Sequence, residues 1–343
     1  MSGPVLIWGT GAVGGAVGAA LVDAGHSVDF VDMDNAHVAA LRDPARGLVV
    51  EGPVRSRAGP VRAWHPDELD GRWDKVMLCV KAHHTAAAAA MIAPHLADGG
   101  SILTLQNGLA ARLAASILGR EHVVVGFVNF GADRIGDGRI LLGNRGAVAL
   151  GEWDGGTTAR LGEFWRLLGD FESEAVATPD IWAFIWGKLA YAALLFAEAT
   201  ATSGIAPTLD RPELLPLFRA LVGEVVAAAR AEGVEPAGFN GFAPNAFGPH
   251  ARALESAASI RAIADFYRGG AKPHSGVWRD LAVHRRKTEV DAQLGMVVDI
   301  AVAHGIAVPA LTGLIALIHR IEAGAAVQDD AHLSELALAF AAA

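Results

Sequence analysis

The chain has 343 residues, 52% of them hydrophobic and 19% charged, which is enough for two globular domains that each bury a core. Its formal net charge of −9 argues against a nucleic-acid partner, because phosphate backbones are bound by clustered lysines and arginines. Cys79 is the only cysteine, so an internal disulfide is excluded and a reducing, cytoplasmic location is expected.

Neither a membrane nor a metal partner is expected. The N-terminus lacks the basic region of a signal peptide, and no unbroken apolar segment reaches membrane-spanning length. The 13 histidines are scattered, without an HExxH motif or paired Cys/His spacing. We therefore expect a protein that acts on small molecules.

The first predicted elements are a buried strand at residues 5–8, a glycine-rich turn, a helix to residue 24 and a second strand at 27–31. In this context Gly9 permits a tight turn, Gly11 lets a pyrophosphate approach the backbone, and Gly14 lets the helix pack closely on the strand. The first N–H groups of the helix then face the phosphates. Although such a turn also occurs without a ligand, its place between strand and helix predicts a dinucleotide site formed by Gly9, Thr10, Gly11, Ala12, Val13 and Gly14.

Asp32 ends the second strand and predicts which dinucleotide binds. A carboxylate at this position accepts hydrogen bonds from the adenosine ribose hydroxyls and repels a 2′-phosphate. No arginine or lysine follows until Arg42. The alternative is a solvated turn acid supported by Asp34. We predict NAD(H), with NADH preferred over NADPH.

Strands and helices then alternate along the chain. The predicted strands lie at 47–51, 61–64, 74–80, 101–105, 123–128 and 174–177, and the predicted helices at 35–41, 85–96, 111–118 and 158–168. We also expect a hairpin that pairs residues 139–142 with 147–150 and turns at 143–146. This alternation is typical of a doubly wound parallel sheet.

After residue 178 the pattern becomes helical. Helices are predicted at 181–201, 213–232, 253–267, 289–304 and 310–323, with a Pro/Gly/Phe-rich loop at 233–249 that is either a lid or an interface. We therefore predict a dinucleotide-binding Rossmann domain at 1–178 and an all-helical substrate and dimerisation domain at 179–343. Its wide apolar helix faces predict a homodimer, although the same faces also suit an internal core.

Two polar residues follow predicted strands at the edge where ligands bind in open parallel sheets. Lys81 comes after the strand DKVMLCV, and Asn107 comes after the strand SILTL. Each alone is an ordinary strand-ending polar residue. Together, on neighbouring strands, they predict contacts to a ligand.

Two residues of the helical region are candidates for acid–base chemistry. Lys188 lies among aromatic residues in PDIWAFIWGKLAY, where a lysine either extends to water or lines a pocket that lowers its pKa. In a pocket it becomes a usable proton donor. Glu289, at the start of a predicted helix, either complements the helix dipole or takes part in the chemistry.

Taken in order, GTGAVG, VKAHHT, LQNGL, WGKLA and RRKTEVDAQLG…AHGIAVP resemble the ketopantoate reductase (2-dehydropantoate 2-reductase) family over nearly the whole chain. The resemblance implies a Rossmann domain joined to a helical domain like that of 6-phosphogluconate dehydrogenase, with the active site between them. It further implies roles for individual residues. Lys81 and Asn107 contact substrate and nicotinamide, Lys188 is the general acid, Glu289 holds a substrate hydroxyl and orients the lysine, and Ser275 lies near a serine that contacts the substrate carboxylate.

The chain also departs from that family. Members that reduce ketopantoate usually carry asparagines four and eight residues after the catalytic lysine, where this chain has Ala192 and Phe196 on the helix face of Lys188. Losing two amides removes hydrogen bonds worth about 1 kcal/mol or more each. The segment 280–289 is one residue longer than usual and carries the basic run HRRK, and Asp32 stands where NADP-dependent members offer an arginine.

We therefore predict an NAD-dependent oxidoreductase that transfers hydride between nicotinamide and a carbonyl or alcohol carbon of a small, carboxylated or polyhydroxylated substrate. Lys188 acts as general acid/base, and Ala192, Phe196 and Ser275 are the predicted substrate-binding positions. Three alternatives remain open at this point. They are a genuine 2-dehydropantoate 2-reductase with atypical contacts, an opine- or amino-acid-type dehydrogenase, and a non-catalytic NAD-binding module.

Overall fold

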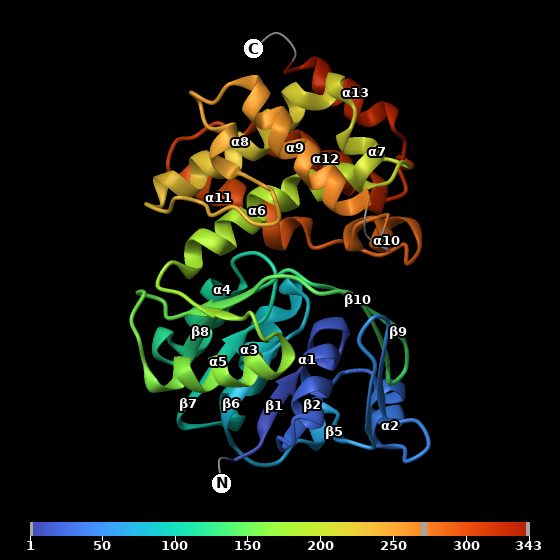
Figure 1. Cartoon of the computed structure of the whole chain (residues 1–343), viewed down its shortest axis with the longest axis vertical. Helices are drawn as coiled ribbons and strands as arrows, with labels where there is room; N and C mark the ends of the chain where they lie inside the picture. Colours follow the sequence, from blue (N-terminus) through green and yellow to red (C-terminus); the bar gives the residue numbers. More distant parts are fainter. Residues whose placement is uncertain (1–2, 269–272, 341–343) are drawn as a thin grey trace. The chain divides into compact units, whose positions relative to one another are not determined.

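The computed structural model describes residues 3–268 and 273–340 and divides the chain into two compact units, Met1–Ile181 and Trp182–Ala343 (Figure 1). The first unit combines a largely parallel sheet with helices, and the second is built of helices. The predicted fold class is therefore confirmed. The units divide three residues after the predicted domain boundary at 178, since the first unit ends at Ile181.

The main sheet of the first unit has eight strands in the order β12-β11-β8-β7-β6-β1-β2-β5. Its neighbours pair in parallel, except that β11 runs antiparallel to β8. The order reverses beside β1, because the chain extends the sheet through β2 and then returns to place β6 on the other side. Ligands of such sheets bind at this reversal, outside the carboxyl ends of the strands. The strands are β1 (Val5–Trp8), β2 (Val28–Val31), β5 (Arg62–Trp64), β6 (Trp73–Leu78), β7 (Leu96–Thr104), β8 (Val123–Val128), β11 (Val148–Gly151) and β12 (Val176–Ala177).

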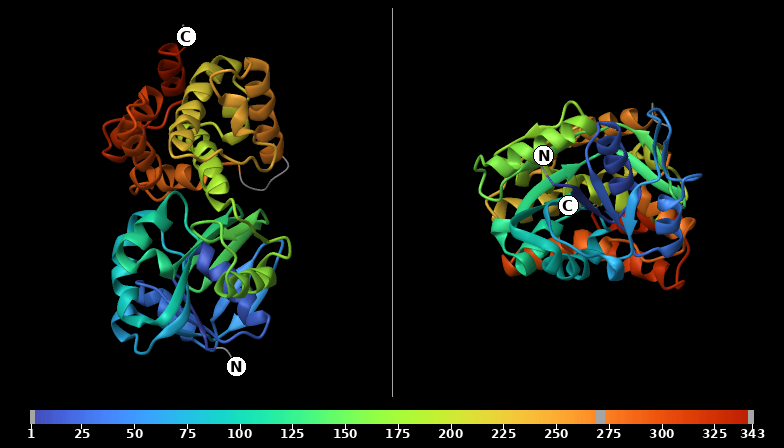
Figure 2. Two further views of the ribbon diagram at one scale, coloured as in Figure 1. Left: turned by 90° about the vertical axis from the view of Figure 1, so that its left-hand side faces the viewer. Right: turned by 90° about the horizontal axis from the view of Figure 1, so that it is seen from below.

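Helices cover both faces of this sheet, which explains why β1 and β8 are buried along their whole length rather than at alternate residues. Helix α1 contacts α5, and α3 contacts α4. Figure 2 (left) shows the teal helices α3 and α4 on one side of the strands and the green helix α5 on the other. All four residues of β1 are buried. The helices are α1 (Ala12–Asp23), α2 (Asn35–Arg42), α3 (Thr85–Ile92), α4 (Ala110–Leu118) and α5 (Ala159–Phe171).

A second sheet, in the order β4-β3-β10-β9, corrects the predicted hairpin. Strand β10 (Arg139–Asn144) pairs with β9 (Gly131–Gly136) and with β3 (Leu48–Glu51), which in turn pairs with β4 (Ser56–Gly59), whereas β11 joins the main sheet. The hairpin turns at Asp137 and Gly138, whose φ of 72° suits glycine. Asp-Gly is the stronger hairpin signal, and it outweighs the turn predicted at 143–146. Gly15 lets this sheet pack on α1, since an added Cβ would lie 2.7 Å from Ile140.

The second unit packs its helices against one another (Figure 2, left). They are α6 (Ile181–Glu198), α7 (Ile205–Leu209), α8 (Leu215–Ala231), α9 (Ala253–Arg268), α10 (Gly276–Ala282), α11 (Met296–Ala303), α12 (Pro309–Glu322) and α13 (Ala331–Leu338). The five predicted helices are present, while α7, α10 and α13 were not predicted. Helix α6, with 18 residues and a mean hydropathy of 1.3, has the length and composition of a membrane span, but 72% of it is buried inside the structure, as in a core helix.

The apolar faces that suggested a dimer are largely used within the unit itself. Leu217, Leu221 and Val225 of α8 are fully buried, as are Leu311 and Leu314 of α12. The loop at 233–249 packs its phenylalanines on this unit too, because Phe239 and Phe242 both contact the ring of Tyr191. These contacts support the core interpretation of the apolar faces and leave the homodimer a prediction.

Candidate functional site

The predicted glycine-rich turn is present, and its shape depends on glycine at positions 9 and 14. Gly9 has a φ of 93°, and an added Cβ there would lie 2.7 Å from Val80 Cγ1. A Cβ on Gly14 would overlap the carbonyl oxygen of Gly9, so the close approach of α1 to β1 depends on glycine there. Gly11, by contrast, has open space beside its Cα. Helix α1 begins at Ala12, and its cap residue Gly11 offers no side chain to the first N–H groups, which suits an anionic ligand.

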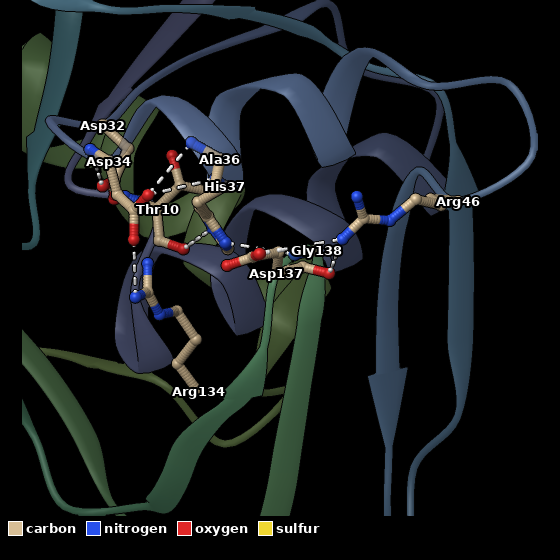
Figure 3. A network of polar contacts seen from close by, with 9 residues as sticks. All are labelled: Thr10, Asp32, Asp34, Ala36, His37, Arg46, Arg134, Asp137 and Gly138. Carbon is tan, nitrogen blue, oxygen red and sulfur yellow. Dashed lines mark hydrogen bonds and ion pairs between the residues drawn. The ribbon is translucent and has the colours of Figure 1, made fainter.

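Thr10 connects this turn to the end of β2 and to α2 (Figure 3). Its backbone N–H donates to Asp32 Oδ2 at 2.9 Å, and its hydroxyl donates to the carbonyl of Val31 at 3.2 Å. Its own carbonyl lies 2.9 Å from Nε2 of the buried His37. Because Nδ1 of the same ring accepts from Gly138 N–H at 3.1 Å, we assign the neutral tautomer with its proton on Nε2. Burial lowers the pKa of His37, which agrees with a neutral ring.

Asp32 therefore stands beside the turn, as predicted, and remains partly exposed. Its Oδ1 accepts the N–H of Asp34 at 3.0 Å. Asp34 caps α2 by accepting the N–H groups of Ala36 and His37, at 3.0 and 3.3 Å. The carboxylate of Asp32 is thus oriented by backbone donors, with part of its surface open to solvent.

Arg134 is a residue of this site that the sequence did not reveal. It comes from β9, and its guanidinium donates to Asp34 Oδ2 at 2.8 Å (Figure 3). This hydrogen bond is the main cause of the lowered pKa of Asp34. The prediction considered only the residues that follow Asp32 in the sequence, so it did not include this arginine, which binds the neighbouring Asp34. Arg42, the nearest cation along the chain, instead donates to the carbonyl of Ala63 at 2.6 Å and pairs with Glu68.

Lys81 and Asn107 follow β6 and β7, which are neighbours in the sheet. Both are partly exposed. Gln106, which sequence reasoning passed over, is buried and ties the two strand ends together, since its Nε2 donates to the carbonyl of Val80 at 2.9 Å and to Thr85 Oγ1 at 2.8 Å. Val80 also touches the position of a Cβ on Gly9. The structure therefore brings Lys81 and Asn107 to the same sheet edge as the glycine-rich turn.

In the second unit Lys188 lies on α6, between the buried Gly187 and Leu189, and is itself half-buried. A Cβ on Gly187 would overlap the carbonyl of Ala237, so glycine lets the loop at 233–249 cross α6 next to the lysine. Burial lowers the pKa of Lys188 to about 8, and the negative charge of Glu289 acts in the opposite direction. The structure thus brings Lys188 and Glu289 into one electrostatic environment.

Glu289 lies where the backbone is irregular. A π-helical turn, Asp291–Gly295, precedes α11, and Gln293 N–H bonds to the carbonyl of Glu289 at 3.0 Å. The wider turn takes up an additional residue, and such turns often occur at functional sites. Thr288 anchors the segment, because its N–H and its hydroxyl each donate to Glu322 of α12 at 2.7 Å.

Ser275 is buried, and its side chain caps the start of α10. Its hydroxyl accepts the N–H of Trp278 at 3.0 Å, and its N–H points to Glu198 Oε2 at 3.4 Å. Glu198 is fully buried on α6, with His274 Nδ1 3.1 Å from its other oxygen, and burial raises the pKa of this carboxyl to about 8.

The family follows from comparison with known proteins. The model described as "Ketopantoate reductase PanE/ApbA" matches residues 5–155, and its C-terminal counterpart matches 180–322. The chain belongs to the ketopantoate reductase family. A 2-dehydropantoate 2-reductase of Halobacterium salinarum is 28% identical, with 92% of this chain and 97% of the relative aligned.

Solved structures show the same fold. A PanE/ApbA family ketopantoate reductase from Ralstonia eutropha JMP134 matches with a TM-score of 0.78 and 26% identity, over 94% of this chain and 99% of that one. D-mandelate dehydrogenase, in a ternary structure with NADH and anilino(oxo)acetate, matches with a TM-score of 0.81 at 20% identity and the same coverage. At that identity the second likeness concerns the fold alone.

Ala192 and Phe196, the two positions on α6 that depart from the usual asparagines of the ketopantoate reductase family, are both buried. Phe196 is 1% exposed and Ala192 is 8% exposed. Neither side chain offers a hydrogen bond, so the helix face that continues from Lys188 is apolar. Their predicted contact with substrate stays a prediction.

The two glycines of the turn allow a matched test. We expect Gly14→Ala to lower the thermal unfolding midpoint of this protein clearly, because the added Cβ has no room against the Gly9 carbonyl. Gly11→Ala should leave the midpoint within about 2 °C, since its Cβ meets open space, yet weaken dinucleotide binding at least about 10-fold by blocking the approach of the pyrophosphate. Calorimetry and nucleotide titration measure the two effects, and an unchanged affinity in Gly11→Ala would contradict this assignment.

The buried carboxyl of Glu198 predicts a pH dependence of stability. Its folded pKa of about 8 exceeds the ordinary value, so the unfolded chain loses its proton first and stability falls as pH rises from about 4.5 to about 8. Glu198→Gln mimics the protonated form. It should match the wild type at about pH 4 and exceed it above pH 8 by a few kcal/mol, on the order given by the shift. Glu335→Gln, on an exposed side chain, is the control. Parallel pH profiles for wild type and Glu198→Gln would refute the prediction.

Proposed function

We propose that this protein is an NAD-dependent oxidoreductase that interconverts a carbonyl and an alcohol on a small, carboxylated or polyhydroxylated substrate. Family membership supports the reaction class. The proposal rests on the environment of Lys188. Burial lowers the pKa of this lysine to about 8, and the negative charge of Glu289 interacts with it. A group with a pKa near the working pH is an effective proton donor and acceptor.

The first unit supplies the cofactor site in this proposal. The N–H groups at the start of α1 hold the pyrophosphate, Asp32 accepts the adenosine ribose hydroxyls, and Lys81 and Asn107 contact the nicotinamide end and the substrate. Bound NADH supplies the hydride that reduces the carbonyl carbon. We assign residues 1–178 to cofactor binding and 179–343 to the substrate and to dimerisation, in a cytoplasmic enzyme.

The second unit supplies the proton. Lys188 donates a proton from Nζ to the carbonyl oxygen as that oxygen gains negative charge, and it accepts the proton back when the alcohol is oxidised. Glu289 holds a substrate hydroxyl. Its charge also keeps the pKa of Lys188 from falling further, so that the lysine stays largely protonated at neutral pH.

The substrate differs from ketopantoate in the part that meets α6. Ala192 and Phe196 present a methyl group and a ring on the lysine's helix face, so they favour an apolar substituent over one that needs amide hydrogen bonds. Ser275, held near Glu198, is the proposed polar contact. D-mandelate dehydrogenase acts on an aryl-substituted 2-hydroxy acid by its name, which makes phenylglyoxylate a useful test compound.

The main alternative is a genuine 2-dehydropantoate 2-reductase, which the name of the Halobacterium salinarum relative favours. A non-catalytic NAD-binding module is the alternative from another class. Oxidation of NADH in the presence of ketopantoate, phenylglyoxylate, other 2-keto acids and sugar-derived carbonyls separates them. Selective turnover of ketopantoate supports the reductase, selective turnover of another carbonyl supports our proposal, and NADH binding without any turnover supports the module.

We predict that NADH binds at least about 10-fold more tightly than NADPH. Asp32 and Asp34 together outweigh the single positive charge of Arg134, so a 2′-phosphate meets net repulsion at short range. Fluorescence titration of both nucleotides at one ionic strength measures the ratio. Equal affinities would contradict the proposed role of the two carboxylates.

For Lys188 we predict a kinetic effect without a binding effect. Lys188→Ala and Lys188→Met should keep NADH affinity nearly intact and lower kcat by about 10²–10⁴-fold, the usual contribution of a positioned proton donor. Met preserves most of the apolar stem, so it separates lost chemistry from lost packing. Glu289→Gln should raise KM more than it lowers kcat.

The pH profile gives an independent check on the same residue. Carbonyl reduction needs protonated Lys188, so its rate should fall as pH rises through about 8, while alcohol oxidation should rise over the same range. Both titrations should vanish in Lys188→Met. Near-normal turnover by that variant would remove Lys188 from the mechanism and make Lys81 or Glu198 the next candidate.

A further inference from the structure

We propose that the ion pair between Asp34 and Arg134 determines cofactor choice, an inference that rests on the proposed dinucleotide site. Asp34 holds the guanidinium of Arg134 and neutralises it. Without the charge on Asp34, Arg134 becomes a ligand for the 2′-phosphate of NADPH. Cofactor choice therefore depends on a residue of the second sheet as well as on the acid that ends β2.

Two contacts anchor the β9–β10 hairpin and thereby set the position of Arg134 (Figure 3). His37 accepts the N–H of Gly138 at the hairpin turn and reaches the carbonyl of Thr10 with its other ring nitrogen. Arg46 donates to the carbonyl of Asp137 at 3.3 Å. The hairpin is thus tied to the same residue, Thr10, whose N–H orients Asp32. Arg134 projects from this hairpin to the turn that follows β2, where the adenosine ribose is expected.

The hydrogen bonds of the two acids show which one restrains the arginine. Both oxygens of Asp32 accept backbone N–H groups, from Thr10 and from Asp34. The two oxygens of Asp34 have different partners. Its Oδ1 caps α2, and its Oδ2 accepts a hydrogen bond from Arg134. Removing the charge on Asp34 therefore releases Arg134 without disturbing the bonds that orient Asp32.

The ion pair between Arg134 and Asp34 contributes little to the stability of the folded protein. The side chains of Arg134 and Asp34 are 36% and 38% exposed, and ion pairs at such exposure contribute little to folding. The hairpin is also anchored by the buried ring of His37. The same exposure leaves the guanidinium free to reorient toward a bound anion, and arginine suits phosphate because its planar donors bind two oxygens at once.

A double-mutant cycle tests the proposal. The variants are Asp34→Asn, Arg134→Ala and their combination, and the measured quantities are the dissociation constants of NADH and NADPH at low salt. Asparagine keeps an oxygen to cap α2 and removes the charge. We expect Asp34→Asn to tighten NADPH binding at least about 10-fold and to change NADH binding by less than about 3-fold. Adding Arg134→Ala should abolish the gain, and raising the salt concentration should reduce it.

The chain offers a matched control on the same hairpin. Arg139 of β10 donates to Glu51 of β3 at 2.7 Å, in an exposed ion pair outside the network of Figure 3. Glu51→Gln removes an equivalent charge and releases an equivalent arginine. It should leave the NADPH affinity unchanged, and a gain as large as that of Asp34→Asn would assign the effect to net charge and overturn the proposal.

The remaining outcomes are equally decisive. A gain that persists in the Asp34→Asn/Arg134→Ala variant would show relief of repulsion alone, which contradicts the role of Arg134. An unchanged NADPH affinity in Asp34→Asn, beside tight NADH binding, would overturn this inference and leave the proposed function standing. A wild-type chain that binds neither nucleotide would overturn both.

Discussion

The contact between α1 and β1 is the constraint on which the first unit depends. The Gly9 carbonyl leaves no room for a Cβ at position 14, so only glycine there lets the helix start this close to the end of the strand. Thr10, between these glycines, then uses its N–H for Asp32, its hydroxyl for Val31 and its carbonyl for His37. One buried residue thereby connects the helix N-terminus, the acid that ends β2 and, through His37, the β9–β10 hairpin. Backbone N–H groups consequently orient the carboxylate of Asp32, whereas the charge of Arg134 is held by the side chain of Asp34.

In the second unit, burial rather than backbone hydrogen bonding determines the state of the titratable groups. Helix α6 is apolar over most of its surface, and three titratable groups on it respond to the loss of water. Burial lowers the pKa of Lys188 to about 8 and raises that of Glu198 to about 8, and it raises the pKa of Tyr191 as well. The helix thus favours neutral forms along its length, with Glu289 as the charge that opposes this tendency at Lys188.

Local patterns were sufficient to predict the two-part fold, the glycine-rich turn, Asp32, and the strand ends that carry Lys81 and Asn107. Each depends on residues close together in the chain. Arg134 could not be predicted in this way, because it meets Asp34 from 100 positions away through the pairing of β9 with β10. The same pairing made the hairpin prediction wrong, because the turn at Asp137 and Gly138 joins residues 139–142 to the strand that precedes them. Gln106 was overlooked because its role, joining two strand ends, exists only once the sheet has formed.

Hydride transfer from the cofactor is the central claim, and deuterium transfer tests it most directly. NADH carrying deuterium at C4, on one face and then on the other, is oxidised by the enzyme with the best carbonyl of the substrate panel, and the product is examined by mass spectrometry. Our account predicts that one of the two preparations delivers its deuterium to the former carbonyl carbon, and that turnover with it is slower when chemistry limits the rate. Loss of deuterium to solvent from both preparations, or oxidation of NADH without formation of an alcohol, would contradict it.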